Sequence, residues 1–157
     1  VKNLKGHAVV VGYDNLGKNI CKRLSEEHEL RVIDKDASNI DELAESDYEY
    51  IYGDFKHGEI REGANLQKAK YIISFSKEKQ VSTAVLDNSN RETVTIVRAD
   101  NFEDASELYD MGADYVIMEN MLAGNRISEY LELYLEDREV FLDEAEAELD
   151  YIRDEEK

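Results

Sequence analysis

One short turn has glycines at the spacing with which a protein backbone holds phosphate. The turn consists of Gly12, Tyr13, Asp14, Asn15, Leu16 and Gly17. It follows an apolar stretch and precedes a stretch with helical periodicity. In such a turn the first glycine permits a tight bend, and the last lets the helix pack close to the strand. The N–H groups at the helix start then bind an anion, so the turn predicts a phosphate-binding site.

Asp14 stands where a phosphate-binding turn normally has its middle glycine. A side chain there obstructs the approach of the backbone to pyrophosphate, and a carboxylate repels it. This departure leaves four interpretations open. Phosphate binding is lost, the phosphate is displaced, a cation bridges the phosphate and the Asp14 carboxylate, or a mononucleotide fills only part of the site.

A second acidic residue, Asp34, ends an apolar stretch 22 positions after Gly12. An acid at this distance accepts hydrogen bonds from ribose hydroxyls, which favours NAD or adenosine over NADP. Lys35, directly after it, weakens the exclusion of a 2′-phosphate. The alternative, that Asp34 only caps the next helix, is disfavoured because Asp36 and Ser38 are better placed for capping.

Further polar and aromatic residues follow three later apolar stretches, where strand ends meet the same crevice. An acid there could accept from the adenine amino group, an aromatic ring could cover the base, and an arginine could contact phosphate or a partner's carboxylate. These candidates are Asp54, Phe55, Ser74, Phe75 and Arg98.

The sequence predicts neither a metal site nor a catalytic one. His7, His28 and His57 are scattered without ligand spacing. Acidic pairs are too frequent to identify an acid–base dyad, and there is no nucleophile elbow, Walker loop or Cys–His pair. An oxidoreductase also needs a region that holds substrate against the cofactor, for which little chain is left. We therefore expect a ligand-binding protein rather than an enzyme.

The elements that must position these residues alternate regularly. Six stretches rich in β-branched residues recur about every 20 residues with helix-period segments between them, at 7–12, 29–34, 48–53, 70–75, 93–98 and 114–118. Several are continuously apolar, as in strands buried on both faces of a parallel sheet. The pattern predicts an α/β fold, a Rossmann-like doubly wound six-stranded parallel sheet with helices on both faces.

The predicted organisation is a nucleotide-binding domain over residues 1–138 and an acidic C-terminal helix or linker over 139–157. A long helix is expected from about residue 121 to residue 137. Its apolar face, which includes Ile127, Leu131 and Leu135, is large for a terminal helix. Either contact with a second subunit or packing under the sheet could cover this face. The chain could also be a fragment of a larger protein.

Composition limits the partners. The formal net charge is −18, from 37 acidic and 19 basic residues, and it excludes nucleic acid because phosphates would be repelled. Acidic residues in every segment favour adaptation to high intracellular salt over an ordinary acidic protein. The lone Cys21 lies in an apolar helical stripe and is expected in the core of a cytosolic protein. No apolar run is long enough for insertion into a membrane.

At several points the sequence resembles the RCK domains, also called KTN or TrkA-N domains. The matching stretches lie in five places: 7–13, 32–34, 52–54, 96–99, and 112–118 followed by 122–124. Of these, Gly112 to Met118 is the most specific, because it is not part of generic Rossmann chemistry. Where the family usually has Gly, Arg and Pro, this chain has Asp14, Asn15 and Glu119.

The resemblance implies a cytosolic regulatory domain that binds NAD or NADH, or alternatively AMP, ADP or ATP. It also implies a homodimer or higher homo-oligomer whose hinge motion controls a membrane channel or transporter for potassium or other cations. Carried onto this chain, Gly12, Tyr13 and Gly17 would frame the phosphate, Asp34 would hold ribose, and Asp54 with Phe55 would lie by adenine. A small NAD-dependent oxidoreductase and a non-binding dimerisation scaffold remain the alternatives.

Overall fold

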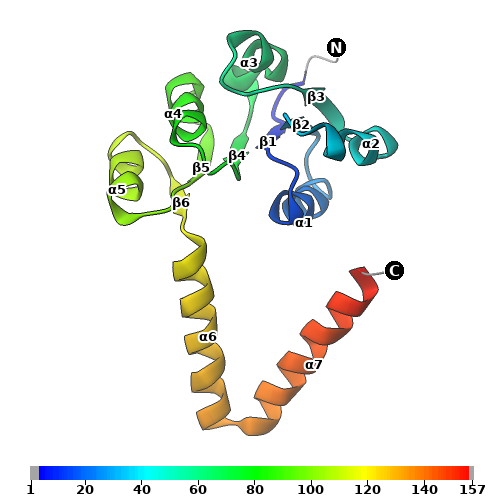
Figure 1. Cartoon of the computed structure of the whole chain (residues 1–157), viewed down its shortest axis with the longest axis vertical. Helices are drawn as coiled ribbons and strands as arrows, with labels where there is room; N and C mark the ends of the chain where they lie inside the picture. Colours follow the sequence, from blue (N-terminus) through cyan, green and yellow to red (C-terminus); the bar gives the residue numbers. More distant parts are fainter. Residues whose placement is uncertain (1–3, 156–157) are drawn as a thin grey trace. The chain divides into compact units, whose positions relative to one another are not determined.

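The chain divides after Met118 into two compact units. A computed structural model describes residues 4–155, and the first unit holds a six-stranded sheet (Figure 1). All neighbouring strands are parallel, in the order β3-β2-β1-β4-β5-β6. The strands are β1 (Ala8–Val11), β2 (Leu30–Asp34), β3 (Glu49–Tyr52), β4 (Tyr71–Ser74), β5 (Val94–Arg98) and β6 (Tyr115–Ile117). The predicted fold class and all six strands are confirmed.

Helices cover both faces of this sheet. On one face lie α1 (Asn15–Leu24) and α2 (Ala37–Glu45), and on the other α3 (Gly58–Ala64), α4 (Lys79–Asn88) and α5 (Phe102–Asp110) (Figure 1). A short 3-10 helix, η1 (Leu66–Lys68), follows α3. Successive side chains of β1 enter opposite cores: Val9 packs with α4 and α5, whereas Val10 packs with α1 and α2. The continuous apolar strands are therefore those buried on both faces.

Local hydrogen bonds set the helix boundaries. The Asp36 carboxylate accepts from the backbone N–H of Ser38 at 2.9 Å and caps α2, as the sequence predicted. Asn101 caps α5 in the same way by accepting from Asp104 N–H at 2.8 Å. After α5 the chain turns at Gly112, whose φ of +107° is a backbone conformation that favours glycine.

The second unit contains two helices, α6 (Glu119–Glu136) and α7 (Arg138–Glu155). They pack against each other through aromatic side chains, with the Phe141 ring centroid 5.2 Å from that of Tyr134. Within the acidic C-terminal segment, for which a helix and a linker were both open, residues 139–155 are helical. Residues 138 and 139, where the sequence predicts a domain boundary, lie at the start of α7, and α6 packs with α7 in one compact unit.

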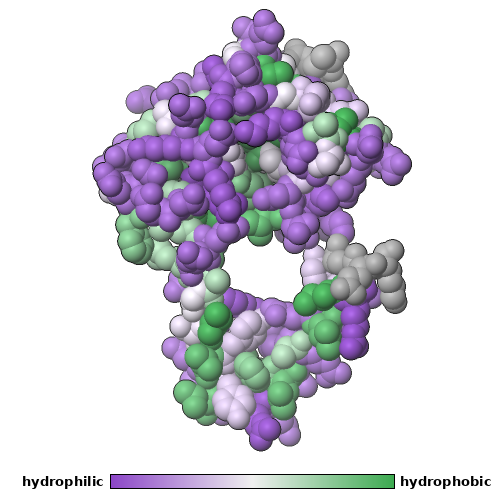
Figure 2. All heavy atoms as spheres, viewed as in Figure 1, coloured by the Kyte–Doolittle hydropathy of each residue, from purple (hydrophilic) through white to green (hydrophobic). Residues whose placement is uncertain are grey.

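The surfaces of α6 and α7 carry many exposed apolar side chains, which Figure 2 shows in green along this unit. No residue of α6 is buried. On α6 the exposed large hydrophobic residues are Met121, Leu122, Ile127, Leu131, Tyr134 and Leu135. Within residues 4–155, no helix combines the length and the apolarity that crossing a membrane requires.

Candidate functional site

The glycine turn lies between β1 and α1 and depends on both of its glycines. Gly12 has a φ of +99°, which side-chain-bearing residues rarely adopt. A Cβ atom on Gly17 would lie 2.1 Å from the carbonyl oxygen of Gly12, so only glycine lets α1 approach the turn this closely. The conformational roles predicted for these two glycines are therefore present.

Asp14 closes the start of α1 with its own side chain. Its carboxylate Oδ1 accepts a hydrogen bond from Gly17 N–H at 2.9 Å, and Asp14 is the N-cap residue of the helix. The N–H group that would otherwise be offered to a phosphate oxygen already has an anionic partner. Asn15 and Leu16 follow in the first turn of α1 with exposed side chains.

Tyr13 contributes its backbone to the turn, whereas its ring packs into the core beneath α1. Burial raises the pKa of the Tyr13 hydroxyl to about 12. The ring is thus a structural anchor, and it is the Tyr13 N–H that faces the end of β2, where it donates to Asp34.

Asp34, at the end of β2, is buried and holds three protein donors. Its Oδ2 accepts from Tyr13 N–H at 2.6 Å and from the Asn39 amide at 3.1 Å, and its Oδ1 accepts from Asp36 N–H at 2.7 Å. A carboxylate has about four acceptor positions. About one acceptor position of the Asp34 carboxylate therefore remains for a ribose hydroxyl. Rotation of the Asn39 amide away from Asp34 would free a second one.

A small cavity of about 60 Å³ lies at the carboxyl ends of β1 to β4. Its walls come from the end of β1, from the loops that follow β1 to β4, and from the first turn of α4: Val11, Gly12, Lys35, Gly53, Asp54, Phe55, Ser76, Glu78 and Val81. An open hollow of about 530 Å³, at the start of α3, shares Gly53 and Asp54 with this cavity. The cavity and hollow together are of the size that small-molecule sites have in proteins.

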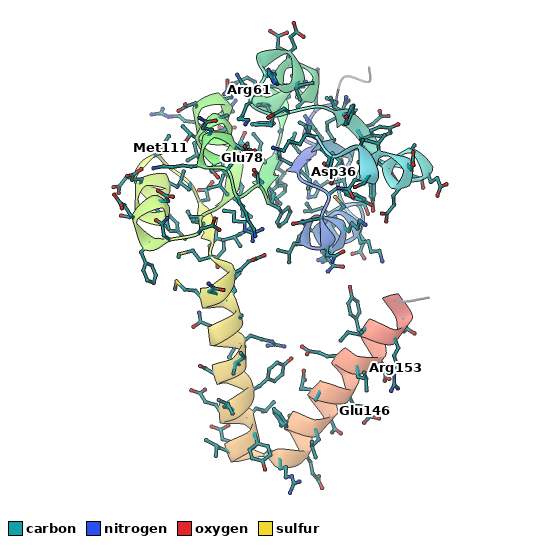
Figure 3. All side chains as sticks on the ribbon, viewed as in Figure 1. Asp36, Arg61, Glu78, Met111, Glu146 and Arg153 are labelled. Carbon is teal, nitrogen blue, oxygen red and sulfur yellow. The ribbon has the colours of Figure 1, made fainter. Side chains whose placement is uncertain are left out.

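Two lysines and one glutamate form an ion bridge at the cavity. Lys35 Nζ lies 2.8 Å from Glu78 Oε2, and Lys56 Nζ lies 2.9 Å from Glu78 Oε1. The two lysine hydrogen bonds lower the pKa of Glu78 to about 2, so its carboxylate stays ionised. Glu78, which is labelled in Figure 3, is the N-cap residue of α4.

Hydrogen bonds to nearby residues hold the loop after β3 in place. Asp54 Oδ1 accepts from the backbone N–H of Lys56 at 2.9 Å. The guanidinium of Arg61, labelled in Figure 3, donates to the carbonyl oxygen of Phe55 at 2.8 Å. These bonds fix Asp54 at the wall that the cavity and the open hollow share.

Not all of the predicted site residues meet at this cavity. Gly12, Lys35, Asp54 and Phe55 line it, although the Phe55 side chain is otherwise buried in the core. Phe75, in contrast, packs into the core on the α1 and α2 face and is absent from the cavity walls.

Ser74 and Arg98 are also buried away from the cavity walls. Ser74 Oγ accepts from Ser76 N–H at 3.2 Å, which shapes the turn after β4. The Arg98 guanidinium donates to the carbonyl oxygen of Phe75 at 3.2 Å. Both polar groups therefore support the backbone of the β4 turn rather than face the crevice.

Sequence reasoning missed Lys56, Glu78 and Val81, and only their position after β3 and β4 could have indicated them.

A larger open hollow, of about 550 Å³, lies at the opposite edge of the sheet near the amino ends of β2 and β3. Acidic side chains such as Glu29 and Glu49 line that hollow, and it has no glycine turn. The carboxyl edge is accordingly the better candidate for a nucleotide.

Comparison with known proteins places these features in a family. The sequence model of the TrkA-N domain matches residues 8–119. A probable potassium channel protein 2 of Methanocaldococcus jannaschii is 29% identical over 139 residues, covering 82% of this chain and 40% of that protein. The Ktr system potassium uptake protein C of Bacillus subtilis is 26% identical over 144 residues, covering 83% and 65%. The chain thus spans less than two thirds of these relatives' length.

Solved structures share the fold. The TrkA-N domain of the inner membrane protein ybaL from Escherichia coli has a TM-score of 0.76 at 24% identity, covering 83% of this chain and 99% of that chain. The Kef CTD of Shewanella denitrificans, in an AMP-bound form, has a TM-score of 0.68 at 16% identity, covering 94% and 92%. The GsuK channel bound to NAD has a TM-score of 0.63 at 19% identity, covering 74% and 22%.

Proposed function

The chain belongs to the TrkA-N domain family, and on this premise we propose that it is a nucleotide-binding regulatory domain of a potassium or other cation transport system. The similarity to a potassium channel and to a potassium uptake protein supports this role. In this proposal the domain works at the cytosolic face of a membrane, on a channel or transporter. In this role the domain binds a ligand and changes the state of the channel or transporter in response. We assign no chemical step to it.

The observation that carries the proposal is the cavity at the carboxyl ends of β1 to β4. Gly12 forms part of its wall, and the Asp34 carboxylate is hydrogen-bonded to the same turn through Tyr13 N–H at 2.6 Å. In open α/β sheets, ligands bind outside the carboxyl ends of the strands where the strand order reverses. Here that reversal lies between β1 and β4.

The ligand in this proposal is NAD, NADH or an adenine mononucleotide. A structural neighbour bound to NAD and another bound to AMP support this class. The remaining acceptor position of Asp34 would take a ribose hydroxyl, and the glycine turn from Gly12 to Gly17 would face the phosphate. Asp54 would accept from the adenine amino group, with the base extending into the adjoining open hollow.

Transmission to a transporter would use the geometry of a homo-oligomer. Support comes from α6, where Leu131 is 57% and Leu135 is 82% exposed and no residue is buried. Apolar surface of this kind marks protein contact sites. A ligand can change the geometry of such an assembly only if it binds one state more tightly than the other.

One observation favours a second candidate, a dimerisation scaffold that binds no nucleotide. The Asp14 carboxylate already occupies Gly17 N–H and brings a negative charge to the phosphate position. A scaffold would keep the exposed surfaces of α6 and α7 but would not respond to adenine ligands.

Calorimetry separates these two functions. The protein is titrated with NAD, NADH, AMP, ADP and ATP at high and low salt, and its oligomeric state is measured by light scattering with and without each ligand. We expect saturable binding of at least one of these ligands at micromolar to millimolar concentration. If the protein forms oligomers and none of the five ligands binds at millimolar concentration, the scaffold is correct and the regulatory binding site is not.

A further inference from the structure

Three charged side chains from three different loops meet at the mouth of the candidate site. Lys35 follows β2, Lys56 follows β3, and Glu78 follows β4. Each lysine ammonium contacts a different oxygen of the one Glu78 carboxylate, at 2.8 and 2.9 Å. One anionic group therefore holds two cations that lie far apart in the sequence.

The two ammonium groups are placed as they would be around a phosphate. Two oxygens of one phosphate group are spaced much like the two oxygens of one carboxylate, so the same pair of lysines could contact either anion. The Asp54 carboxylate is the other acid at this point, with Oδ2 3.7 Å from Lys56 Nζ. The formal charges of these two lysines and two acids cancel, so the group as a whole does not attract an incoming anion.

We infer that Glu78 determines the charge selectivity of the crevice, by occupying the place where Lys35 and Lys56 would bind a phosphate carried on the ligand's ribose. This inference rests on the proposed function, in which Asp34 holds the ribose. Lys35 directly follows Asp34, so a phosphate on the ribose is the ligand group nearest to it. The native protein thus prefers NAD to NADP, and the preference comes from Glu78 as well as from Asp34.

Glu78 can be changed without removing a helix cap. It precedes the first residue of α4, but its side chain makes no capping hydrogen bond. At the helix start its backbone carbonyl accepts from Val81 N–H at 3.0 Å and from Ser82 N–H at 3.3 Å, and its backbone N–H donates to Ser76 Oγ at 3.2 Å. Glu78→Gln therefore removes the charge while keeping the size of the side chain and the helix start.

NAD and NADP form the matched pair of ligands for the test, because they differ only in the 2′-phosphate. Calorimetry at low salt measures both affinities for the native protein and for Glu78→Gln. We expect the native protein to bind NAD more tightly. In Glu78→Gln the affinity for NADP should rise relative to that for NAD by about tenfold, since two freed lysines can each make a charge-assisted hydrogen bond.

Two further variants make the test specific. Lys35→Met added to Glu78→Gln should restore the preference for NAD. Glu107→Gln serves as the control, because Glu107 pairs with Lys79 between α4 and α5, away from the cavity walls. This control removes the same charge and should leave the ratio of NAD to NADP affinity unchanged. Thermal unfolding of each variant establishes that it is folded.

The outcomes distinguish this inference from the proposed function. If Glu78→Gln binds NAD but its ratio of NAD to NADP affinity equals that of the native protein, the inference is wrong and the nucleotide site stands. If neither ligand binds to the native protein or to Glu78→Gln, the inference is wrong, and the proposed function is wrong as well only if NADH, AMP, ADP and ATP also fail to bind. A gain in NADP affinity that disappears at high salt supports the inference, because salt screens the attraction between exposed lysines and a phosphate.

Discussion

The Asp14 carboxylate accepts a hydrogen bond from the backbone N–H of Gly17 at 2.9 Å. The first turn of α1 thus contains its own anion, at the point where phosphate-binding turns leave N–H groups free. This bond stabilises the helix and competes with a phosphate for the same donor. Helix capping and ligand binding therefore oppose each other at Asp14.

Replacing Asp14 should strengthen phosphate binding. Asp14→Asn keeps a capping oxygen but removes the charge, and we expect AMP to bind about fivefold more tightly, since a unit charge at contact distance in water contributes about 1 kcal/mol. Asp14→Gly also frees the Gly17 N–H and should bind AMP more tightly still, at a cost of a few tenths of a kcal/mol in stability. Calorimetry and urea unfolding measure the two effects.

The control for Asp14 is Asp110→Asn, which removes an exposed acid of α5. It reports how much affinity changes when the net charge of −18 is reduced by one anywhere on the surface. Equal affinities for AMP in Asp14→Gly, Asp14→Asn and the native protein would show that phosphate does not contact this turn.

Asp34→Ala should weaken both binding and folding. The substitution removes the acceptor of Tyr13 N–H, and a buried donor left unpaired costs about 1–3 kcal/mol. Loss of a ribose hydrogen bond should reduce NAD affinity by about tenfold. Asp36→Ala is the matched control, because it removes only the cap of α2 and should cost about 1 kcal/mol with NAD affinity unchanged. Unaltered NAD affinity in Asp34→Ala would place the ligand elsewhere.

Gly17→Ala should destabilise the protein by about 2 kcal/mol or more, because its Cβ would overlap the Gly12 carbonyl oxygen at 2.1 Å and the backbone must shift. Gly58→Ala, at the start of α3, meets only the Arg61 guanidinium at 3.7 Å and should change stability by less than about 0.5 kcal/mol. Urea unfolding of the two variants gives the comparison, and equal stabilities would contradict the close packing of α1 on the turn.

Burial lowers the pKa of His7, and the nearby Arg31 lowers it further, while a hydrogen bond to the Ala64 carbonyl and the Glu29 charge oppose the shift. The unfolded state then binds a proton more readily than the folded state as pH falls below 6.5. Stability should therefore decrease from pH 7.5 to pH 5.5. His7→Gln keeps an amide donor for Ala64, and we expect a smaller decrease in urea-unfolding free energy over that interval. An identical decrease would exclude His7 as its source.

Cys21 should be unreactive in the folded protein. Its side chain is fully buried, and burial raises the pKa of the thiol to about 12, which leaves almost no thiolate at neutral pH. A disulfide reagent is expected to label it at the rate of unfolding, and at once in concentrated urea. Fast labelling of the native protein would show that α1 opens locally.

The sequence by itself determined the order of the elements and the local roles. Continuous apolar stretches must be strands buried on both faces, and the glycine turn must join the first strand to the first helix. Asp36 was identified as a helix cap because capping depends on residues only two or three positions apart. The placement of Asp34 at the end of β2 was predictable because Asp34 ends an apolar stretch of the sequence.

Only the tertiary structure decided which side chains meet. Lys35 and Glu78 are 43 positions apart, and their ion pair exists because the parallel sheet brings the loops after β2 and β4 to one edge. Phe75, directly after β4, was a candidate for covering a base. Because side chains alternate along a strand, Phe75 instead points into the core between the sheet and helices α1 and α2. A one-dimensional pattern specifies which residues form a strand, whereas contacts between distant residues depend on how the strands are ordered and which face each side chain takes.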